Sequence, residues 1–209
     1  MDWGILWQYR EALLAGFTVT LWVSAASIAG STVLGVAIGC LGTLPSLLLA
    51  RLVGTYTEVL RNLPVIVKLF FFYFVVGLPV VPASVLALSL HQSAYIADVT
   101  SAGIRSVARG QLDASLSLGH SRWQAFLYVI LPQVMRIVIP PMTTQYVSVI
   151  KNSSVCALIS LQELTYQTQQ INVETFRGFE AATAATLLYI LIALAVIGLL
   201  SKLHQRLTA

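Results

Sequence analysis

The most constraining feature of this 209-residue sequence is a long run without any charged residue near its start. This run covers residues 12–50, and a second uncharged run covers residues 181–201. A helix needs about 20 apolar residues to cross the hydrocarbon core of a bilayer. Because lipid offers no hydrogen-bond partners to the backbone, such runs cross a membrane as helices. The sequence therefore predicts a helical membrane protein.

Composition agrees with this prediction. Hydrophobic residues make up 57% of the chain and charged residues only 10%, whereas a soluble domain carries about 25% charged residues. The net charge of +4 does not indicate nucleic-acid binding, because the basic residues are scattered between apolar stretches. Cys40 and Cys156 lie far apart in apolar surroundings, which supports neither CxxC redox chemistry nor a metal site.

Turn and polar segments divide the chain into five expected transmembrane helices. We expect an all-α, polytopic protein with a single domain over residues 1–209. The expected spans are residues 13–41, 56–77, 82–100, 132–150 and 181–201, and the polar loop 101–123 joins the third span to the fourth. On the first span, small residues recur at every fourth position, namely Ser27, Ser31, Gly35 and Gly39. This spacing lets two helix backbones approach closely in lipid and predicts a packing face, with no particular partner.

The distribution of charge predicts the orientation of the spans. Five spans place the two chain ends on opposite sides of the membrane. One side collects Arg51, Arg105, Arg109, Arg122, Lys202 and Arg206. The other side collects Arg10, Lys151 and Arg177 together with Asp2, Glu11, Glu163, Glu174 and Glu180. Because cytoplasmic loops carry an excess of lysine and arginine, we expect a cytoplasmic 101–123 loop and C-terminus and an external N-terminus.

The loop 101–123 contains a short segment suited to contact with another protein. Ala114 and Ser115 are small, so a partner can approach the backbone of a helix that carries them. Gly119 can adopt the left-handed conformation that ends a helix. Pro132 is tolerated in the first turn of the span that follows. The same residues would also fit an ordinary solvated loop with a chance helix, and the spacing described next favours the first interpretation.

The loop resembles the EAA motif of binding-protein-dependent ABC permeases, EAA-x3-G-x9-I-x-LP. Residues 113–119 read DASLSLG, and after nine residues the chain continues with Val129-Ile130-Leu131-Pro132. The spacing matches throughout, with Asp113, Ser115 and Val129 as departures in residue type. The resemblance implies a coupling helix that docks on a cytoplasmic ATPase. The residues it implies for this contact are Gln111, Leu112, Asp113, Ala114, Ser115, Leu116, Gly119 and Arg122.

Four further segments resemble permeases for polar amino acids of the histidine, glutamine and arginine type. These segments are YTEVLRNLP at residues 56–64, SAYIAD at 93–98, KNSS at 151–154 and LQEL at 161–164. Asn62, Leu63 and Gln162 depart from the commoner Gly, Thr and Pro. The resemblance covers nearly the whole chain and implies a type I ABC importer permease of the bacterial inner membrane. It would carry amino acids by alternating access.

The same resemblance implies a set of partners. The chain would pair with itself or with a similar permease subunit, with two cytoplasmic ATPases and with an external solute-binding protein. The sequence contains no GxxxxGK[ST] segment, so it lacks the loop that cradles nucleotide phosphates in P-loop ATPases. ATP and Mg would therefore be bound by the partner ATPase, with no cofactor in this chain. We find no catalytic constellation and do not expect an enzyme.

Charged residues near or inside the spans mark candidate substrate contacts. Lys68 lies in the apolar segment 65–74, where a cation is costly unless it faces a partner or a polar cavity. A substrate carboxylate and the side chain of Asp98 are two possible partners for it. Glu163 follows the fourth span, where broken helices of transporters line substrate cavities. It could bind a substrate ammonium group with Lys151 or Ser154 nearby, or it could be an exposed loop carboxylate.

Other functions stay open at this point. An ABC permease could carry a metal ion, an opine or an osmolyte instead of an amino acid. A secondary transporter or channel would need no ATPase but would leave the loop motif unexplained. A membrane-bound enzyme is disfavoured by the missing catalytic residues. On the second span, Glu58 and Arg61 are three residues apart, a spacing that allows them to pair and brace the helix.

Overall fold

The computed structural model describes residues 3–208, apart from the side chains of Arg109 and Thr208. Asp2 and the Arg109 side chain, both used in the charge argument, lie outside what is described. Within this range the chain is helical and contains no strand. Four helices are long and apolar enough to cross a membrane, at Arg10–Leu41, Val80–Ser106, Arg122–Ile159 and Gly178–Leu207. The expected all-α membrane fold is confirmed.

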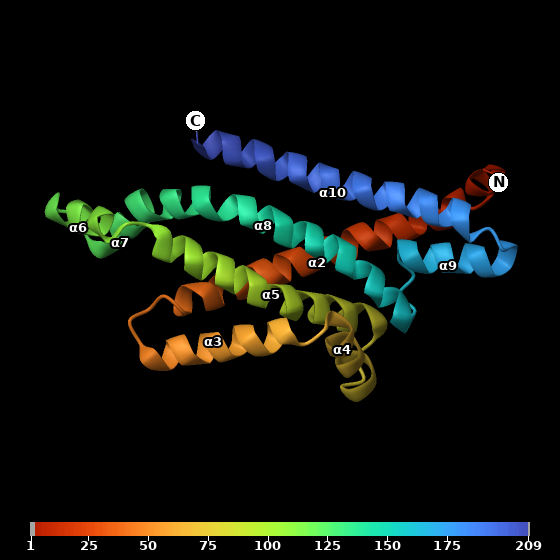
Figure 1. Cartoon of the computed structure of the whole chain (residues 1–209), viewed down its shortest axis with the longest axis horizontal. Coiled ribbons are helices and arrows are strands. Elements are labelled where there is room, and N and C mark those ends of the chain that lie inside the picture. Colours follow the sequence, from red (N-terminus) through yellow and green to blue (C-terminus); the bar gives the residue numbers. More distant parts are fainter. Residues whose placement is uncertain (1–2, 209) are drawn as a thin grey trace.

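The helices form an elongated bundle (Figure 1). Their bounds are α1 Gly4–Gln8, α2 Arg10–Leu41, α3 Leu47–Asn62, α4 Val65–Phe70, α5 Val80–Ser106, α6 Arg109–Ser117, α7 Arg122–Ala125, α8 Leu131–Ser153, α9 Leu164–Thr175 and α10 Gly178–Thr208. A π-helical turn, η1 Phe71–Val75, continues α4, and a second one, η2 Phe126–Ile130, precedes α8. A 3-10 helix, η3 Ser154–Ile159, follows α8. In Figure 1, α6 and α7 lie at one end of the long axis, and α1 and α9 lie at the other.

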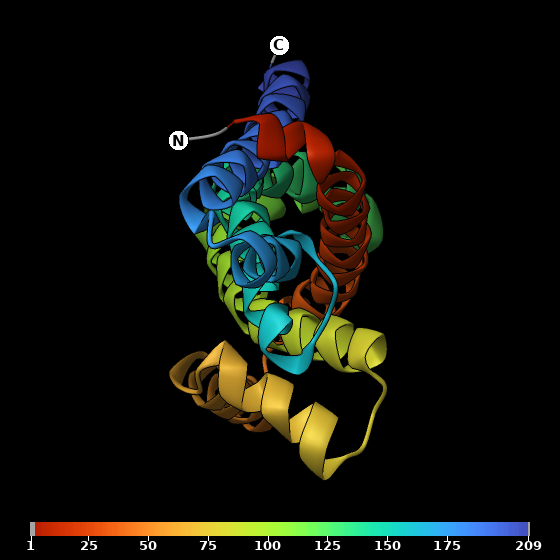
Figure 2. The same cartoon turned by 90° about the vertical axis from the view of Figure 1, so that its right-hand side faces the viewer.

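The second expected span, 56–77, is wrong as a single helix. Helix α3 begins earlier, at Leu47, and ends at Asn62, and α4 begins at Val65. The break lies at Leu63 and Pro64, which both have extended ψ angles, 129° and 147°. Proline disfavours helical backbone at the residue before it, so α3 ends there. Figure 2 shows α3 and α4 at the periphery, outside the bundle of the longer helices.

The small residues of α2 pack against α5. Ser27, Ser31, Gly35 and Gly39 are all buried. A Cβ atom on Gly35 would come within 2.6 Å of Ile96 Cβ, and one on Gly39 would come within 2.7 Å of the Ala97 carbonyl oxygen. The two backbones therefore approach too closely for a larger side chain. The packing face expected from the sequence has α5 of the same chain as its partner.

Three clusters of buried apolar residues hold the helices together. The first joins α2, α4, α5 and η3 around Leu69 and Leu88. The second joins α1, α2, α9 and α10 around Leu164 and Ile171, and the third joins α5 and α8 around Ile96. Outside these clusters much of the apolar surface is exposed, as at Leu47 (80%) on α3 and Leu199 (69%) on α10. Lipid or partner subunits can cover such a surface, whereas its exposure to water would be unfavourable.

Candidate functional site

The loop with the EAA-like motif forms a separate small unit at one end of the bundle. Helix α5 continues to Ser106, so the loop begins later than the expected residue 101. Helix α6 then carries the motif, and Gly119, with φ +88°, ends it in the left-handed region. Ser121 starts α7 with a capping box in which Ser121 and Gln124 bond to each other's backbone amides. The turn thus follows from the glycine and the cap that the sequence places there.

The motif residues divide between an exposed face and an inward face. Gln111, Asp113, Ala114, Gly119 and Arg122 are exposed, and Leu112 and Leu116 are half-buried. Ser115 is buried, and its hydroxyl lies 2.9 Å from His120 Nδ1 across the turn. The geometry therefore leaves the small residue Ala114 open to a partner, whereas Ser115 holds the turn. Leu118 (81% exposed) and Trp123 (67% exposed) add apolar surface beside this face.

Two of the family-like segments contact each other directly. The segment 56–64 on α3 and the segment 93–98 on α5 are joined by a hydrogen bond between Tyr56 Oη and Ser93 Oγ, 2.6 Å long. They are also joined by the ion pair between Arg61 and Asp98. The Arg61 guanidinium lies over the Tyr95 ring as well, 5.1 Å from its centre. These polar contacts attach the peripheral α3 to the bundle.

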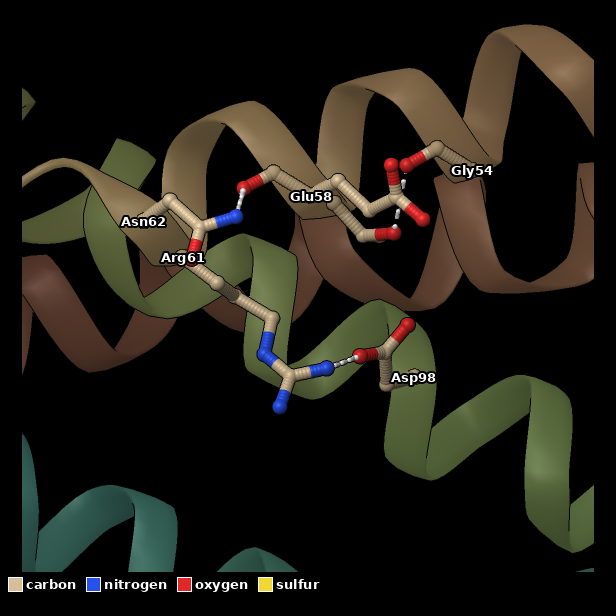
Figure 3. A network of polar contacts seen from close by, with 6 residues as sticks. Gly54, Glu58, Arg61, Asn62 and Asp98 are labelled. Carbon is tan, nitrogen blue, oxygen red and sulfur yellow. Dashed lines mark hydrogen bonds and ion pairs between the residues drawn. The ribbon is translucent and has the colours of Figure 1, made fainter.

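Figure 3 shows the arrangement around Arg61. Its side chain reaches across to Asp98 on α5, and the Asn62 amide nitrogen donates to the Glu58 carbonyl oxygen at 2.8 Å. The expected pairing of Glu58 with Arg61 is wrong, because Asp98 takes the guanidinium. An ion pair between helices can hold their positions, which a pair within one helix cannot do.

Lys68 lies on α4, one turn after the break between α3 and α4, and is buried (5% exposed). Its ammonium donates to the carbonyl oxygens of Leu60 (2.6 Å) and Leu63 (2.7 Å) and lies 2.9 Å from His91 Nδ1. The alternative pairing of Lys68 with Asp98 is wrong. The break leaves carbonyl groups at the end of α3 without helical donors, and Lys68 supplies these donors. Sequence analysis missed His91, whose signal was an ionisable residue inside a span.

Glu163 is fully buried (0% exposed), so the interpretation as an exposed loop carboxylate is wrong. Its Oε1 accepts from the Tyr166 amide at 2.8 Å and caps α9. Its Oε2 accepts from the Tyr189 hydroxyl of α10 at 2.5 Å. Burial raises the pKa of this carboxyl, and hydrogen bonds from Tyr189, Thr165 and Tyr166 act in the opposite direction. Tyr189 was missed because its partner lies in another helix.

Lys151 and Ser154 line one groove at the end of α8. The groove measures about 310 Å³ between α8 and α10, and its other lining residues are Thr186, Tyr189, Ile190 and Ala193. Tyr189 links the groove to Glu163, which lies behind it. Three of the four residues expected near a substrate are thus gathered around this groove, directly or through Tyr189. Lys68 is not among its lining residues.

The fold and the site define a helical membrane subunit with a short protruding helix at one end and, toward the other, a groove lined by Lys151 and Ser154. The chain belongs to the family of binding-protein-dependent transport system inner membrane components, whose model matches residues 11–209. The predicted family and permease fold are confirmed. The protein is therefore a multi-span permease component of an ABC importer.

Several permeases are similar to this chain over most of their length. The glutamine transport system permease protein GlnP of Escherichia coli (strain K12) is 33% identical, over 98% of this chain and 97% of the relative. The probable glutamine ABC transporter permease protein GlnM of Bacillus subtilis (strain 168) is 36% identical, over 92% and 91%. The glutamate/aspartate import permease protein GltJ of Escherichia coli (strain K12) is 30% identical, over 91% and 88%.

Solved structures agree with this family. A crystal structure of an amino acid ABC transporter with histidines is 27% identical and superimposes over 99% of each chain with a TM-score of 0.89. An inward-facing structure of the MetNI methionine ABC transporter is 18% identical, with a TM-score of 0.84 over 97% of this chain and 99% of the other. The second likeness is one of fold alone.

Proposed function

We propose that this chain is the permease subunit of an ATP-driven importer for polar amino acids, with glutamine-like solutes as the first candidates. The observation that carries the proposal is the match over nearly full length to relatives that are named as glutamine and glutamate/aspartate permeases. No described residue points to a metal, opine or osmolyte in preference. The amino-acid class therefore has the stronger support.

The proposed complex contains two permease subunits, two cytoplasmic ATPases that bind ATP and Mg, and an external solute-binding protein. The second permease copy is identical or similar to this chain. Three cavities of the described chain lie between its helices or beside its loop, and the lining of none of them extends from the α6 end of the bundle to the α9 end. A passage between two subunits accounts for this. ATP shifts the equilibrium of the complex because it binds the two conformations with different affinities.

The loop helix α6 is proposed as the element that transmits this shift. Its exposed residues, Gln111, Asp113 and Ala114, form the docking face together with Gly119, and Arg122 lies beside it. Leu112 and Leu116 are half-buried between this face and the bundle. Ser115 supports the face from inside through His120. A rigid loop of this kind moves with the ATPase and carries α5 and α8 with it, because it joins these two spans.

The solute path is proposed to run past the groove of Lys151 and Ser154. A lysine ammonium there can attract a solute carboxylate, and Glu163 acts through Tyr189 by fixing the position of its hydroxyl in the groove. The bonds of Lys68 to Leu60 and Leu63 favour a structural role for that residue over direct contact with solute.

The test is the ATPase activity of the complex reconstituted in proteoliposomes with its binding protein and a panel of amino acids. We expect stimulation by one amino-acid class, lost in Gly119→Val and largely kept in Gly119→Asn. A β-branched residue is strained at φ +88°, whereas asparagine tolerates this region. Uptake without ATP hydrolysis, or unchanged coupling in Gly119→Val, would contradict the proposal. Stimulation by a metal ion or an osmolyte instead would contradict its amino-acid part.

A further inference from the structure

Two adjoining cavities lie at the α6 end of the bundle, beside the proposed docking helix. The larger one, here the basic chamber, measures about 860 Å³ and is lined by Arg105, Arg122 and Trp123. The rest of its lining comes from α2, α5, η2, Leu112 of α6 and the turns that follow α2 and α5. The smaller one, here the apolar chamber, measures about 240 Å³ and lies deeper, between α2, α5, α8 and α10. Cys40, Ile104 and Phe126 line both chambers. The two chambers therefore adjoin at these residues.

The basic chamber carries positive charge without a compensating acid. Its lining contains no aspartate or glutamate. Among the described residues, neither Arg105 nor Arg122 forms an ion pair, although Arg105 donates to the Gly42 carbonyl oxygen at 2.7 Å. Two guanidinium groups can bind a phosphate through several parallel hydrogen bonds. Trp123, beside them and 67% exposed, is a residue type enriched at membrane–water interfaces.

The apolar chamber is suited to a hydrocarbon chain. Its lining is almost entirely aliphatic and aromatic, with Val134, Val138 and Met142 on the α8 side. Thr100 also lines it, and its hydroxyl is buried without a hydrogen-bond partner in the described chain. Val36, Met135 and Leu203 are 36%, 39% and 43% exposed at its edge, on three helices long enough to span the membrane. A molecule in the surrounding lipid can therefore reach it between these helices.

We propose that the two chambers together bind one anionic phospholipid, with its phosphate at Arg105 and Arg122 and an acyl chain in the apolar chamber. A soluble anion would satisfy the arginines but would leave the adjoining apolar cavity unused. A neutral lipid would fill that cavity but would leave two cations without a counter-charge. Basic pockets between membrane helices bind anionic headgroups for this reason. The inference uses the proposed orientation only to assign the lipid to the cytoplasmic leaflet.

The first experiment measures lipid retention by the purified complex with native mass spectrometry, in the absence of ATP and amino acid. Phosphatidylglycerol and phosphatidylcholine with identical acyl chains are the probes. We expect preferential retention of phosphatidylglycerol. Loss of one arginine near the headgroup should lower the affinity for phosphatidylglycerol roughly five-fold. The double variant Arg105→Gln/Arg122→Gln should therefore lower this affinity roughly 25-fold. The melting temperature of this double variant is measured as well, so that a loss of bound lipid can be distinguished from a loss of the folded structure.

The matched control is Arg51→Gln/Arg136→Gln. It removes the same charge from two exposed arginines that line neither chamber. Equal loss of phosphatidylglycerol in both double variants would show a general charge effect and overturn the proposal. Equal retention of the two lipids by the natural chain would do the same. Displacement of the lipid by inorganic phosphate would assign the arginines to a soluble anion, which also overturns it.

A second experiment locates the acyl chain. Phosphatidylglycerol with a photoreactive diazirine in its acyl chain is bound to the complex and activated, and the labelled peptides are sequenced. We expect label on the residues of α2 and α8 that line the apolar chamber, including Cys40 and Met142. Label found only on other faces of the chain would overturn the proposal. The same holds if the residues of the apolar chamber stay unlabelled because a partner subunit covers them. Because neither experiment measures transport, failure of the importer function would not be confused with failure of lipid binding.

Discussion

At the scale of single residues, the polar groups inside this chain are mostly bound to other parts of the same chain. Lys68 donates to the carbonyl oxygens of Leu60 and Leu63, Asp98 pairs with Arg61, and Glu163 accepts from Tyr189 and Tyr166. An unpaired polar group buried in an apolar environment is costly. The partners therefore explain why these residues are tolerated within so hydrophobic a chain.

Glu163 gives a prediction at this scale. Glu163→Ala should lower the stability of the complex by about 1–3 kcal/mol, because the Tyr189 hydroxyl and the Tyr166 amide lose their acceptor. Glu163→Gln retains an acceptor for Tyr166 and should be much less harmful. The measurement is the thermal unfolding of the purified complex in one detergent.

The pH dependence of the same variants has a defined sign. The pKa of Glu163 is raised by burial, so the protonated form is favoured in the folded chain. Its contribution to stability is complete below the ordinary glutamate pKa of about 4.3 and is lost as the pH rises through the raised value. The glutamine of Glu163→Gln is uncharged at every pH and does not lose stability in this way. As the pH rises from about 4.3 through the raised pKa, the melting temperature of Glu163→Gln should therefore rise relative to that of the natural chain. Parallel curves for the two proteins would contradict the assignment.

At the scale of elements, close backbone packing decides which helices are neighbours. The small residues of α2 leave room for α5, and the break at Leu63 and Pro64 divides the outer span into α3 and α4. Both effects arise from side chains that are small or rigid rather than from hydrophobicity. Lipid competes equally well for apolar side chains, so helix contacts in a membrane depend on close fit and polar bonds.

Gly35→Ala tests the contact between α2 and α5. The added Cβ would lie 2.6 Å from Ile96 Cβ and 2.7 Å from the Ser93 carbonyl oxygen, so the backbones must separate. We expect a loss of about 1–3 kcal/mol, read as a lower melting temperature of the complex. The control is Gly198→Ala on α10, where the added Cβ meets no atom within 4 Å. Equal melting temperatures for the two variants would contradict this packing.

At the scale of the whole molecule, the chain passes back and forth so that its two ends lie toward opposite ends of the bundle. Figure 1 places α1 and α9 at one end, with α6, α7 and the last turns of α10 toward the other. The basic residues Arg51, Arg105, Arg122, Lys202 and Arg206 belong to the start of α3, the end of α5, the start of α7 and the end of α10, which all lie toward the α6 end. The excess of basic residues there supports a cytoplasmic location under the positive-inside rule.

Cysteine labelling tests this orientation. In a background with Cys40 and Cys156 replaced by alanine, Ser117→Cys places a thiol on exposed α6, and Val173→Cys places one on α9, where Val173 is 68% exposed. A membrane-impermeant maleimide added to intact spheroplasts should label Val173→Cys and should label Ser117→Cys only after lysis. The reverse pattern would invert the proposed topology.

The sequence by itself determined the features that depend on neighbouring residues. The uncharged runs predicted membrane helices, and the spacing from Asp113 to Pro132 predicted the loop helix, its glycine end and the family. These properties depend on length, hydrophobicity and local backbone preference, all of which are fixed over one or two helical turns. The second span is the exception, because Pro64 interrupts the single helix expected over residues 56–77.

Only the tertiary structure decided which distant residues meet. Arg61 binds Asp98 rather than Glu58, Lys68 lies beside His91, and Tyr189 reaches Glu163. Each contact depends on the rotation and depth of two helices that are separate in the sequence. A helix turns by about 100° per residue, so a small change in rotation or register would exchange one partner for another. Packing of all the helices together fixes that rotation, and no local pattern in the sequence specifies it.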